Sequence, residues 1–379
     1  MPHLLDATMF WTAAGGGVRR YVEAKNSFAQ QRHWTHAVAA PVSDGISRVA
    51  VPAWPLPGSG GYRLPVRRAA MARLMERQRP DVIEAGDPYR LAWSALDAAQ
   101  SLGIPAVAFC HSNLVRLAEG LLPAGAGALA ARAARAYLRN LYGRFDAVLA
   151  PSESMCAHLR DWGVPRVACQ PLGVDSAVFH PRRRDHSWRT WLGMQPDARV
   201  LVYAGRFAPE KNLQVLADAV GRLGAPYWLV VVGAGPTPPT GDRVRVLPPR
   251  QSPADVAAVL ASADAFVHAG DQETFGLSVL EALACGIPVV ARACEGLREL
   301  VDDNLGMRVE RGTSEEFAEA IAALFRVGPE SFAGAARARG ERGDWQRVLP
   351  LLWARYDDLR ARARKPEAWA GVDAVNVLR

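Results

Sequence analysis

Short apolar runs separated by polar loops recur along the whole chain. Runs of about four to eight apolar residues bounded by Gly, Pro or Asp are typical of buried strands, and longer segments with apolar residues every three or four positions are typical of helices. Runs of the first kind occupy residues 3–10, 37–40, 81–85, 106–110, 146–150, 199–204 and 227–232. Helical segments follow several of them, so the pattern predicts an α/β protein with parallel sheets.

The stretch 266–291 contains one complete unit of this kind. An apolar run is followed by a polar loop, a helix from about Gly276 to Gly286, and a second apolar run after Pro288. Gly286 is suited to end the helix, and Pro288 prevents its continuation. The unit carries two carboxylates eight positions apart, Glu273 in the loop and Glu281 in the helix. We therefore expect this unit to be central to the function.

The surroundings of these carboxylates favour a binding site. Glu281 lies among apolar residues such as Leu280 and Leu283, so a simply solvated side chain is not expected. The backbone N–H groups of residues 274–277 lie at the start of the helix, where they attract anions or hydroxyl oxygens. The loop is thus suited to a sugar hydroxyl or phosphate, and Glu281 to a ribose diol. The alternative interpretation is that the two glutamates bind no ligand.

The string HAGDQETFGLSVLEALACGIPVVA resembles the E-x7-E signature of retaining glycosyltransferases of family 4. It is most similar to the GDP-mannose-dependent α-mannosyltransferases of that family. The resemblance includes the turn and the helix exit as well as both glutamates, and it extends over roughly residues 15–360. It implies the GT-B fold, in which two Rossmann-like domains face a central cleft. The residues that it assigns to the donor within this unit are Glu273, Thr274, Phe275, Gly276, Leu277 and Glu281.

The length of 379 residues suits two such domains. We expect an N-terminal acceptor-binding domain at residues 1–172 and an interdomain linker at 173–197. A donor-binding domain is expected at 198–344. A C-terminal helix, about residues 345–379, should cross back to complete the first domain, as the resemblance implies.

Two cations follow the strand at 199–204. Arg206 and Lys211 lie on one strand-to-helix loop, and the chain has only three lysines. A guanidinium fork beside an ammonium group is suited to clamp a diphosphate; the alternative is an exposed loop with solvated charges. The resemblance also assigns this pair to the donor phosphates, and it places Gly233 and Gly235 of a later loop around the nucleotide.

The first half of the chain offers further candidates. Gly16 and Gly17 follow the first strand, where glycines permit close backbone approach, but the spacing is not that of G-x-G-x-x-G. The resemblance places them at the donor phosphates and places His111, at a strand end, near the transferred sugar. Asp87 and Tyr89 also follow a strand, which suggests an acceptor site or an ordinary turn.

The chemistry expected of this set needs no metal or cofactor. The chain contains no D-x-D carboxylate pair, so Arg206, Lys211 and the helix-start amides would neutralise the leaving diphosphate. The resemblance implies a retaining hexosyltransferase that uses front-face attack, with catalytic positions at His111, Glu273, Arg206 and Lys211. The substrates would be a nucleotide sugar, most simply GDP-mannose, and a lipid or glycan acceptor. A UDP-sugar transferase, a GT-B epimerase and a non-catalytic sensor remain alternatives.

The net charge of +7 is carried almost entirely by arginine. Helical segments near 63–77 and 128–145 have basic faces, which suggests either peripheral contact with an anionic membrane or simply solvated faces. Nucleic acid is not expected, because no basic run is interleaved with stacking aromatics. Oligomeric state is not predicted.

The location expected from the sequence is the cytoplasm, alone or at the surface of the cytoplasmic membrane. The five cysteines are scattered without a C-x-x-C pair, which fits a reducing compartment. No secretory signal is visible at the N-terminus, and no run of about 18 uncharged apolar residues is present.

Overall fold

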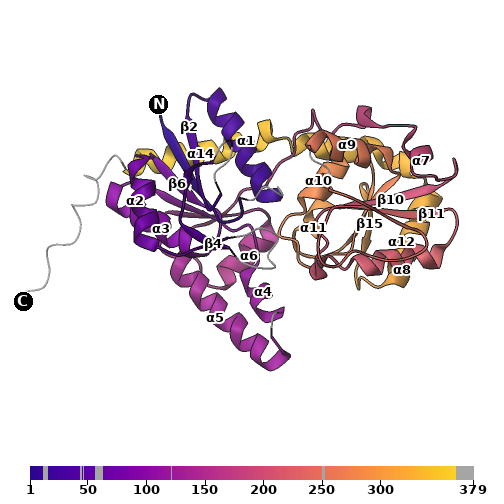
Figure 1. The fold of residues 1–379 in the computed structure, drawn as a ribbon, viewed down its shortest axis with the longest axis horizontal. Coiled ribbons are helices and arrows are strands. Elements are labelled where there is room, and N and C mark those ends of the chain that lie inside the picture. The colour runs from indigo at the N-terminus through magenta and orange to yellow at the C-terminus, as the bar shows by residue number, and fades with distance from the viewer. Residues whose placement is uncertain are drawn as a thin grey trace, which may run out of the picture.

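The computed structural model describes residues 1–11, 16–42, 45, 47–55, 63–120, 122–249 and 252–363. Its long strands form two separate parallel sheets, each covered by helices on both faces, and the two halves lie side by side (Figure 1). The predicted α/β class is therefore confirmed.

The first sheet has seven strands in the order β3-β2-β1-β6-β7-β8-β9. They are β1 His3–Ala7, β2 Thr35–Ala40, β3 Ser47–Ala50, β6 Val82–Ala85, β7 Ala106–Phe109, β8 Ala147–Ala150 and β9 Val167–Cys169. Successive residues of β1 enter different cores, since Leu4 clusters with Trp353 and Leu5 with Met71. Both faces of this sheet are thus buried, which explains the uninterrupted apolar runs of its strands.

The second sheet has six strands in the order β12-β11-β10-β13-β14-β15. They are β10 Arg199–Ala204, β11 Tyr227–Val232, β12 Val244–Leu247, β13 Ala265–His268, β14 Val289–Arg292 and β15 Gly306–Val309. A small antiparallel pair, β4 Ala53–Pro55 and β5 Arg63–Pro65, belongs to neither sheet.

Helices connect the parallel strands in both halves. In the first half they are α1 Gly17–Gln31, α2 Arg68–Arg77, α3 Arg90–Leu102, α4 Leu114–Gly120, α5 Ala124–Tyr142 and α6 Glu153–Asp161. After β9 they are η1 Pro181–Arg183, α7 Trp188–Trp191, η2 Pro209–Lys211, α8 Leu213–Leu223, α9 Pro253–Ser262, α10 Leu277–Ala284, α11 Glu295–Leu300, α12 Ser314–Val327, η3 Pro329–Phe332, α13 Ala333–Arg342 and α14 Trp345–Ala363.

The last helix returns to the first half, as Figure 1 shows. The Trp353 ring of α14 packs edge-on against Phe28 of α1, with 4.9 Å between ring centroids. The hydroxyl of Tyr356 on the same helix donates to Glu84 of β6. These contacts tie the end of the chain to the first sheet. The domain limits predicted from the sequence remain predictions.

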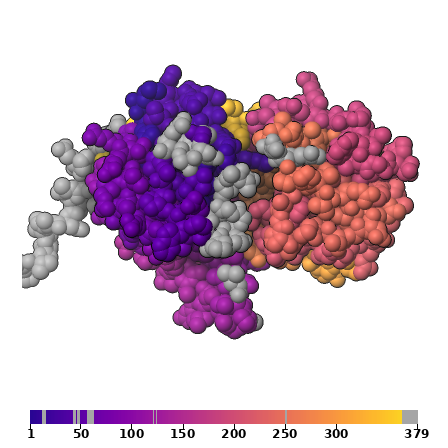
Figure 2. All heavy atoms as spheres, viewed as in Figure 1, coloured from indigo at the N-terminus to yellow at the C-terminus, as the bar shows by residue number. Residues whose placement is uncertain are grey.

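Two elements differ from those predicted from the sequence, the first strand and the helical segment near 128–145. The first strand ends at Ala7 instead of residue 10, because the carboxylate of Asp87 accepts from the Met9 backbone N–H and draws the chain out of the sheet. The helical segment near 128–145 is one arm of a hairpin, α4 and α5, that projects from the first half (Figures 1 and 2).

Candidate functional site

The unit that carries both glutamates forms β13, a loop and α10. Gly276 precedes the helix with φ 94°, and a Cβ there would lie 2.2 Å from Leu297 Cδ2. Only glycine fits this turn without backbone strain and without moving the Leu297 side chain. The turn brings residues 273–277 to the carboxyl end of β13 and the N-terminus of α10. This is where α/β sheets hold ligands.

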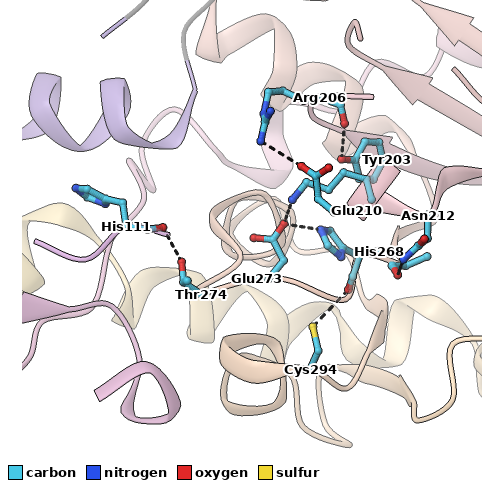
Figure 3. A network of polar contacts seen from close by, with 12 residues as sticks. His111, Tyr203, Arg206, Glu210, Asn212, His268, Glu273, Thr274 and Cys294 are labelled. Atoms are coloured by element: carbon cyan, nitrogen blue, oxygen red, sulfur yellow. Dashed lines mark hydrogen bonds and ion pairs between the residues drawn. The ribbon is translucent and has the colours of Figure 1, made fainter. Parts of the chain in front are cut away.

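Glu273 is held by two basic side chains at this edge (Figure 3). Lys211, at the end of η2, forms an ion pair with its carboxylate. His268, the last residue of β13, places Nε2 3.2 Å from the same oxygen. Burial by itself would raise the pKa of Glu273, but the neighbouring Lys211 and His268 hold it well below its usual range. The carboxylate is therefore ionised and can accept hydrogen bonds from hydroxyl groups.

The two cations of the predicted clamp have different partners. Lys211 is only 13% exposed and contacts Glu273, whereas the Arg206 side chain is 67% exposed and lies 3.4 Å from Glu210. Both remain on the loop between β10 and α8, as predicted. The direct pairing of Lys211 with Glu273 was not predicted, because 62 residues separate them and nothing in either local pattern links them.

Gly233 and Gly235 have a structural reason to be glycine. A Cβ at Gly233 would lie 1.9 Å from the Gly205 carbonyl oxygen, and one at Gly235 would lie 2.1 Å from that of Phe207. The loop after β11 therefore packs its backbone directly on the loop that carries Arg206. Contact with a nucleotide remains a prediction for both.

Glu281 is buried in α10 and paired with a residue of the other half. Its side chain is 3% exposed and forms an ion pair with Arg20 of α1. Arg20 was assigned no role in the sequence analysis. The pair joins residues 261 positions apart, so only the packing of the two halves could show it.

Gly16 and Gly17 lie at the start of α1, and Gly17 faces the second half. Gly16 has φ 123°, and a Cβ added there would meet nothing within 4 Å. A Cβ at Gly17 would lie 3.5 Å from Leu277 Cδ2 at the start of α10. The predicted glycine loop and the predicted helix-start amides thus lie together. A ligand in that position would contact both halves.

His111 follows β7, and its backbone carbonyl faces the same region. Its carbonyl oxygen accepts from the Thr274 hydroxyl at 2.9 Å (Figure 3). Its ring stacks on Phe109 and meets the edge of Tyr21. Burial, assisted by the charge of Lys25, lowers the pKa of His111 to about 3, so the imidazole is neutral near pH 7.

A buried polar network supports the residues behind His111. The Lys25 ammonium is fully buried, 2.6 Å from Asp6 and 2.8 Å from Glu84. Glu84 also accepts from the Tyr21 hydroxyl, whose ring contacts His111. This network was not predicted from the sequence, because its members come from α1, β1 and β6 and no local motif joins them.

Asp87 and Tyr89, the candidate acceptor residues, have internal roles. Asp87 is 1% exposed, and its oxygens accept from the backbone N–H groups of Met9 at 2.7 Å and Tyr89 at 3.1 Å. Burial raises the pKa of Asp87 to about 6. This geometry fits an ordinary turn, which the sequence left open as the alternative to an acceptor site. The half-buried Tyr89 packs edge-on against Phe10.

Two further observations concern metals and membranes. Within the described ranges, His, Cys, Asp and Glu side chains form no group of three that could hold a metal ion. The described helices include none that is long and apolar enough to cross a bilayer.

Comparison with known proteins places both halves in one family. The model described as Glycosyltransferase Family 4 matches residues 14–178, and that described as Glycosyl transferases group 1 matches residues 198–326. A GDP-mannose-dependent α-mannosyltransferase of Mycolicibacterium smegmatis is 38% identical over 270 residues, 69% of this chain and 68% of that protein. A GDP-mannose-dependent α-(1-6)-phosphatidylinositol dimannoside mannosyltransferase of Mycobacterium tuberculosis is 32% identical over 327 residues, 82% of each protein.

Solved structures share the architecture. Anabaena Alr3699/HepE in complex with UDP and glucose has a TM-score of 0.75 at 19% identity, over 93% of this chain and 99% of that one. Sucrose-phosphate synthase from Thermosynechococcus elongatus has a TM-score of 0.76 at 19% identity, over 96% of this chain and all of that one (100%). At such identities the likeness shows the fold. The chain therefore belongs to glycosyltransferase family 4, has the two-domain GT-B fold and is a glycosyltransferase.

Proposed function

We propose that this glycosyltransferase moves mannose from GDP-mannose to a lipid or glycan acceptor, with retention of anomeric configuration and without a metal ion or other cofactor. The main support is the identity of 38% and 32% to two proteins named as GDP-mannose-dependent mannosyltransferases. The arrangement of Glu273, Lys211 and Glu281 at the edge of the second sheet is chemically suited to a nucleotide sugar.

The donor would lie against the start of α10. The ionised Glu273 would accept hydrogen bonds from hexose hydroxyls, and Glu281 would accept from the ribose diol. Glu281 is paired with Arg20, and Glu273 with Lys211. Binding would therefore exchange these ion pairs for contacts with sugar hydroxyls and with the diphosphate.

The leaving diphosphate would be stabilised by protein cations and backbone N–H groups. Lys211 is close enough to Glu273 to lie between the hexose and the diphosphate. The exposed Arg206 can rotate from Glu210 toward phosphate oxygens, and Gly276 and Leu277 lie at the positive end of α10. Charge that develops on the leaving group would thus meet preorganised positive groups, which is a large source of rate enhancement.

Retention of the anomeric configuration is explained most simply by front-face attack. Glu273 is already engaged by Lys211 and His268, so we assign it to binding and name no carboxylate nucleophile. An oxygen of the departing diphosphate would take the acceptor proton. The neutral imidazole of His111 can hydrogen-bond a hydroxyl of the transferred sugar, and this would orient the anomeric carbon.

The decisive experiment presents the purified protein with radiolabelled GDP-mannose, UDP-glucose and UDP-GlcNAc. We expect slow hydrolysis of GDP-mannose alone and transfer when a lipid extract is supplied. Linkage predicts about 2.7 kcal/mol of stabilisation at a hundredfold excess of ligand over its dissociation constant, so GDP-mannose should raise Tm most. Stabilisation and turnover with a UDP sugar, and neither with GDP-mannose, would replace the mannosyl assignment with the UDP-sugar alternative.

A further inference from the structure

The hairpin of α4 and α5 exposes a cluster of leucines at its outer end. Leu117 in the middle of α4 is 46% exposed, Leu122 between the helices 49%, and Leu129 in the second turn of α5 69%. The space-filling view shows this hairpin projecting from the body of the first half (Figure 2). Large apolar side chains gathered on a projection are costly in water unless something covers them.

The packing of the hairpin does not account for these leucines. α5 buries Ala131, Ala134, Leu138 and Leu141, which recur at intervals of three and four residues and so form one face. α4 packs along α5, and the hairpin is complete without burying Leu129. The leucines are therefore free for an external surface.

Positive charge surrounds the apolar cluster. Residues 114–145 contain five arginines and a single acidic residue, Glu119. The exposed side chains of Arg116, Arg132 and Arg135 form no ion pair with any part of the chain that the structure describes. Some exposed arginines elsewhere are paired, as Arg298 is with Glu310. The α4–α5 hairpin is thus an apolar tip with an unneutralised basic flank.

We propose that the α4–α5 hairpin docks the enzyme on an anionic lipid bilayer, with Leu117, Leu122 and Leu129 in the interfacial layer and the arginines on lipid phosphates. The proposal rests on the lipid acceptor of the proposed function and names the surface that would reach it. A convex apolar tip fits a fluid interface better than a folded partner, and arginines beside leucines match anionic headgroups in charge.

The hairpin is joined directly to the candidate site. α4 begins at Leu114, three residues after His111. Asn113, between them, donates to Glu295 of the second half at 3.1 Å. A bilayer contact at the tip would therefore hold the cleft near the headgroup layer. The other basic helix, α2, lacks this combination, because none of its side chains is a large exposed hydrophobic and Arg68 is paired with Asp97.

Vesicle co-sedimentation of the full chain tests the proposal. We expect binding to phosphatidylcholine vesicles that contain phosphatidylglycerol, little binding to phosphatidylcholine alone, and release at high salt. The variants Leu122→Gln/Leu129→Gln and Arg132→Gln/Arg135→Gln should each weaken binding roughly tenfold or more. Matched controls are Val327→Gln/Leu351→Gln, exposed at 59% and 56%, and Arg182→Gln/Arg183→Gln. Both controls should bind as wild type.

The results of these experiments distinguish a failure of the docking surface from a failure of the proposed function. Thermal protection by GDP-mannose should be the same in wild type and hairpin variants, since the substitutions lie outside the cleft. Vesicle binding without any response to GDP-mannose would overturn the mannosyl assignment alone. Equal vesicle binding by wild type and hairpin variants would overturn the docking surface. So would a wild-type dimer in light scattering that the leucine variant dissociates, because a second copy would then cover the tip.

Discussion

At the residue scale, the charged side chains of the candidate site are paired with one another. The ammonium of Lys211 lies against the carboxylate of Glu273, which is only 18% exposed. A buried carboxylate that loses such a partner is left with a large desolvation cost. Lys211 therefore has two roles in our account, one toward Glu273 and one toward the diphosphate, whereas Arg206 has only the second.

Lys211→Ala should consequently be more harmful than Arg206→Ala. Loss of a charge-assisted hydrogen bond typically removes about 1.5–3 kcal/mol, so Arg206→Ala should weaken donor affinity roughly 10- to 150-fold. Lys211→Ala should weaken it further and also raise the pKa of Glu273. Calorimetric titration with GDP-mannose measures the affinity of each variant. The exposed Arg222→Ala on the same half is the control, and wild-type affinity in Lys211→Ala would remove the clamp from the account.

In our proposal, protein cations and not a metal ion stabilise the leaving diphosphate. This leads to a second prediction at the residue scale. Transfer or hydrolysis assayed after dialysis against EDTA should keep most of its rate, because Lys211, Arg206 and the α10 amides supply the positive charge. Magnesium or manganese added back should change little. Loss of activity in EDTA that either ion restores would contradict the cation-clamp mechanism.

The neutral state of His111 predicts how stability depends on pH. Its folded pKa is about 3 and its unfolded value is 6.5, so the unfolded chain binds the proton first. Stability from this group is complete above pH 6.5 and falls as the pH drops toward 3, by at most about 1.4 kcal/mol per pH unit. Urea unfolding of His111→Gln between pH 6.5 and 4.5 should show a shallower decline than wild type. The exposed His186→Gln should keep the wild-type slope.

At the scale of elements, local patterns predicted much of the site, and long-range packing supplied the rest. The helix expected from Gly276 to Gly286 is α10, Leu277–Ala284, with both glutamates where the spacing placed them. Its pairing with Arg20 could not be predicted, because distant charges carry no signal in one sequence. At the start of α12, the Thr313 side chain accepts from the Glu316 N–H, and the Glu316 carboxylate accepts from backbone N–H groups before the cap.

Gly276→Ala tests whether the turn before α10 positions the site. The φ of Gly276 is positive, and a methyl group there would lie 2.2 Å from Leu297 Cδ2, so the backbone would be strained and the buried Leu297 side chain would have to move. We expect a loss of about 1–3 kcal/mol in the free energy of unfolding and a weaker response to GDP-mannose. Gly221→Ala on α8, where a Cβ meets nothing within 4 Å, is the matched control. Unchanged stability and unchanged donor protection would show that the turn tolerates a side chain.

At the scale of the whole molecule, the two halves share an apolar cluster and are also joined by several polar contacts. Arg20 pairs with Glu281, Asn113 with Glu295, and the Thr274 hydroxyl with the His111 carbonyl. Glu299 of α11 accepts from the backbone N–H groups of Glu153 and Ser154 at the start of α6, at 2.9 and 2.7 Å. Interfaces of this polar kind permit relative motion of domains. Of these contacts, the Arg20–Glu281 pair is the one that the ribose of a donor would replace in our account.

The Arg20–Glu281 pair should therefore favour the arrangement in which the two halves are close together. Glu281 is buried but Arg20 is 30% exposed, so we expect its loss to cost about 1–2 kcal/mol, a 5- to 30-fold shift toward open forms. Small-angle scattering of Arg20→Ala without donor should give a larger radius of gyration than wild type. GDP-mannose should restore the wild-type value, because the ribose diol would then satisfy Glu281. Arg298→Ala, which breaks a pair within the second half, should scatter as wild type. Identical scattering by Arg20→Ala and wild type, with unchanged donor affinity, would show that Arg20 neither holds the halves together nor competes for Glu281.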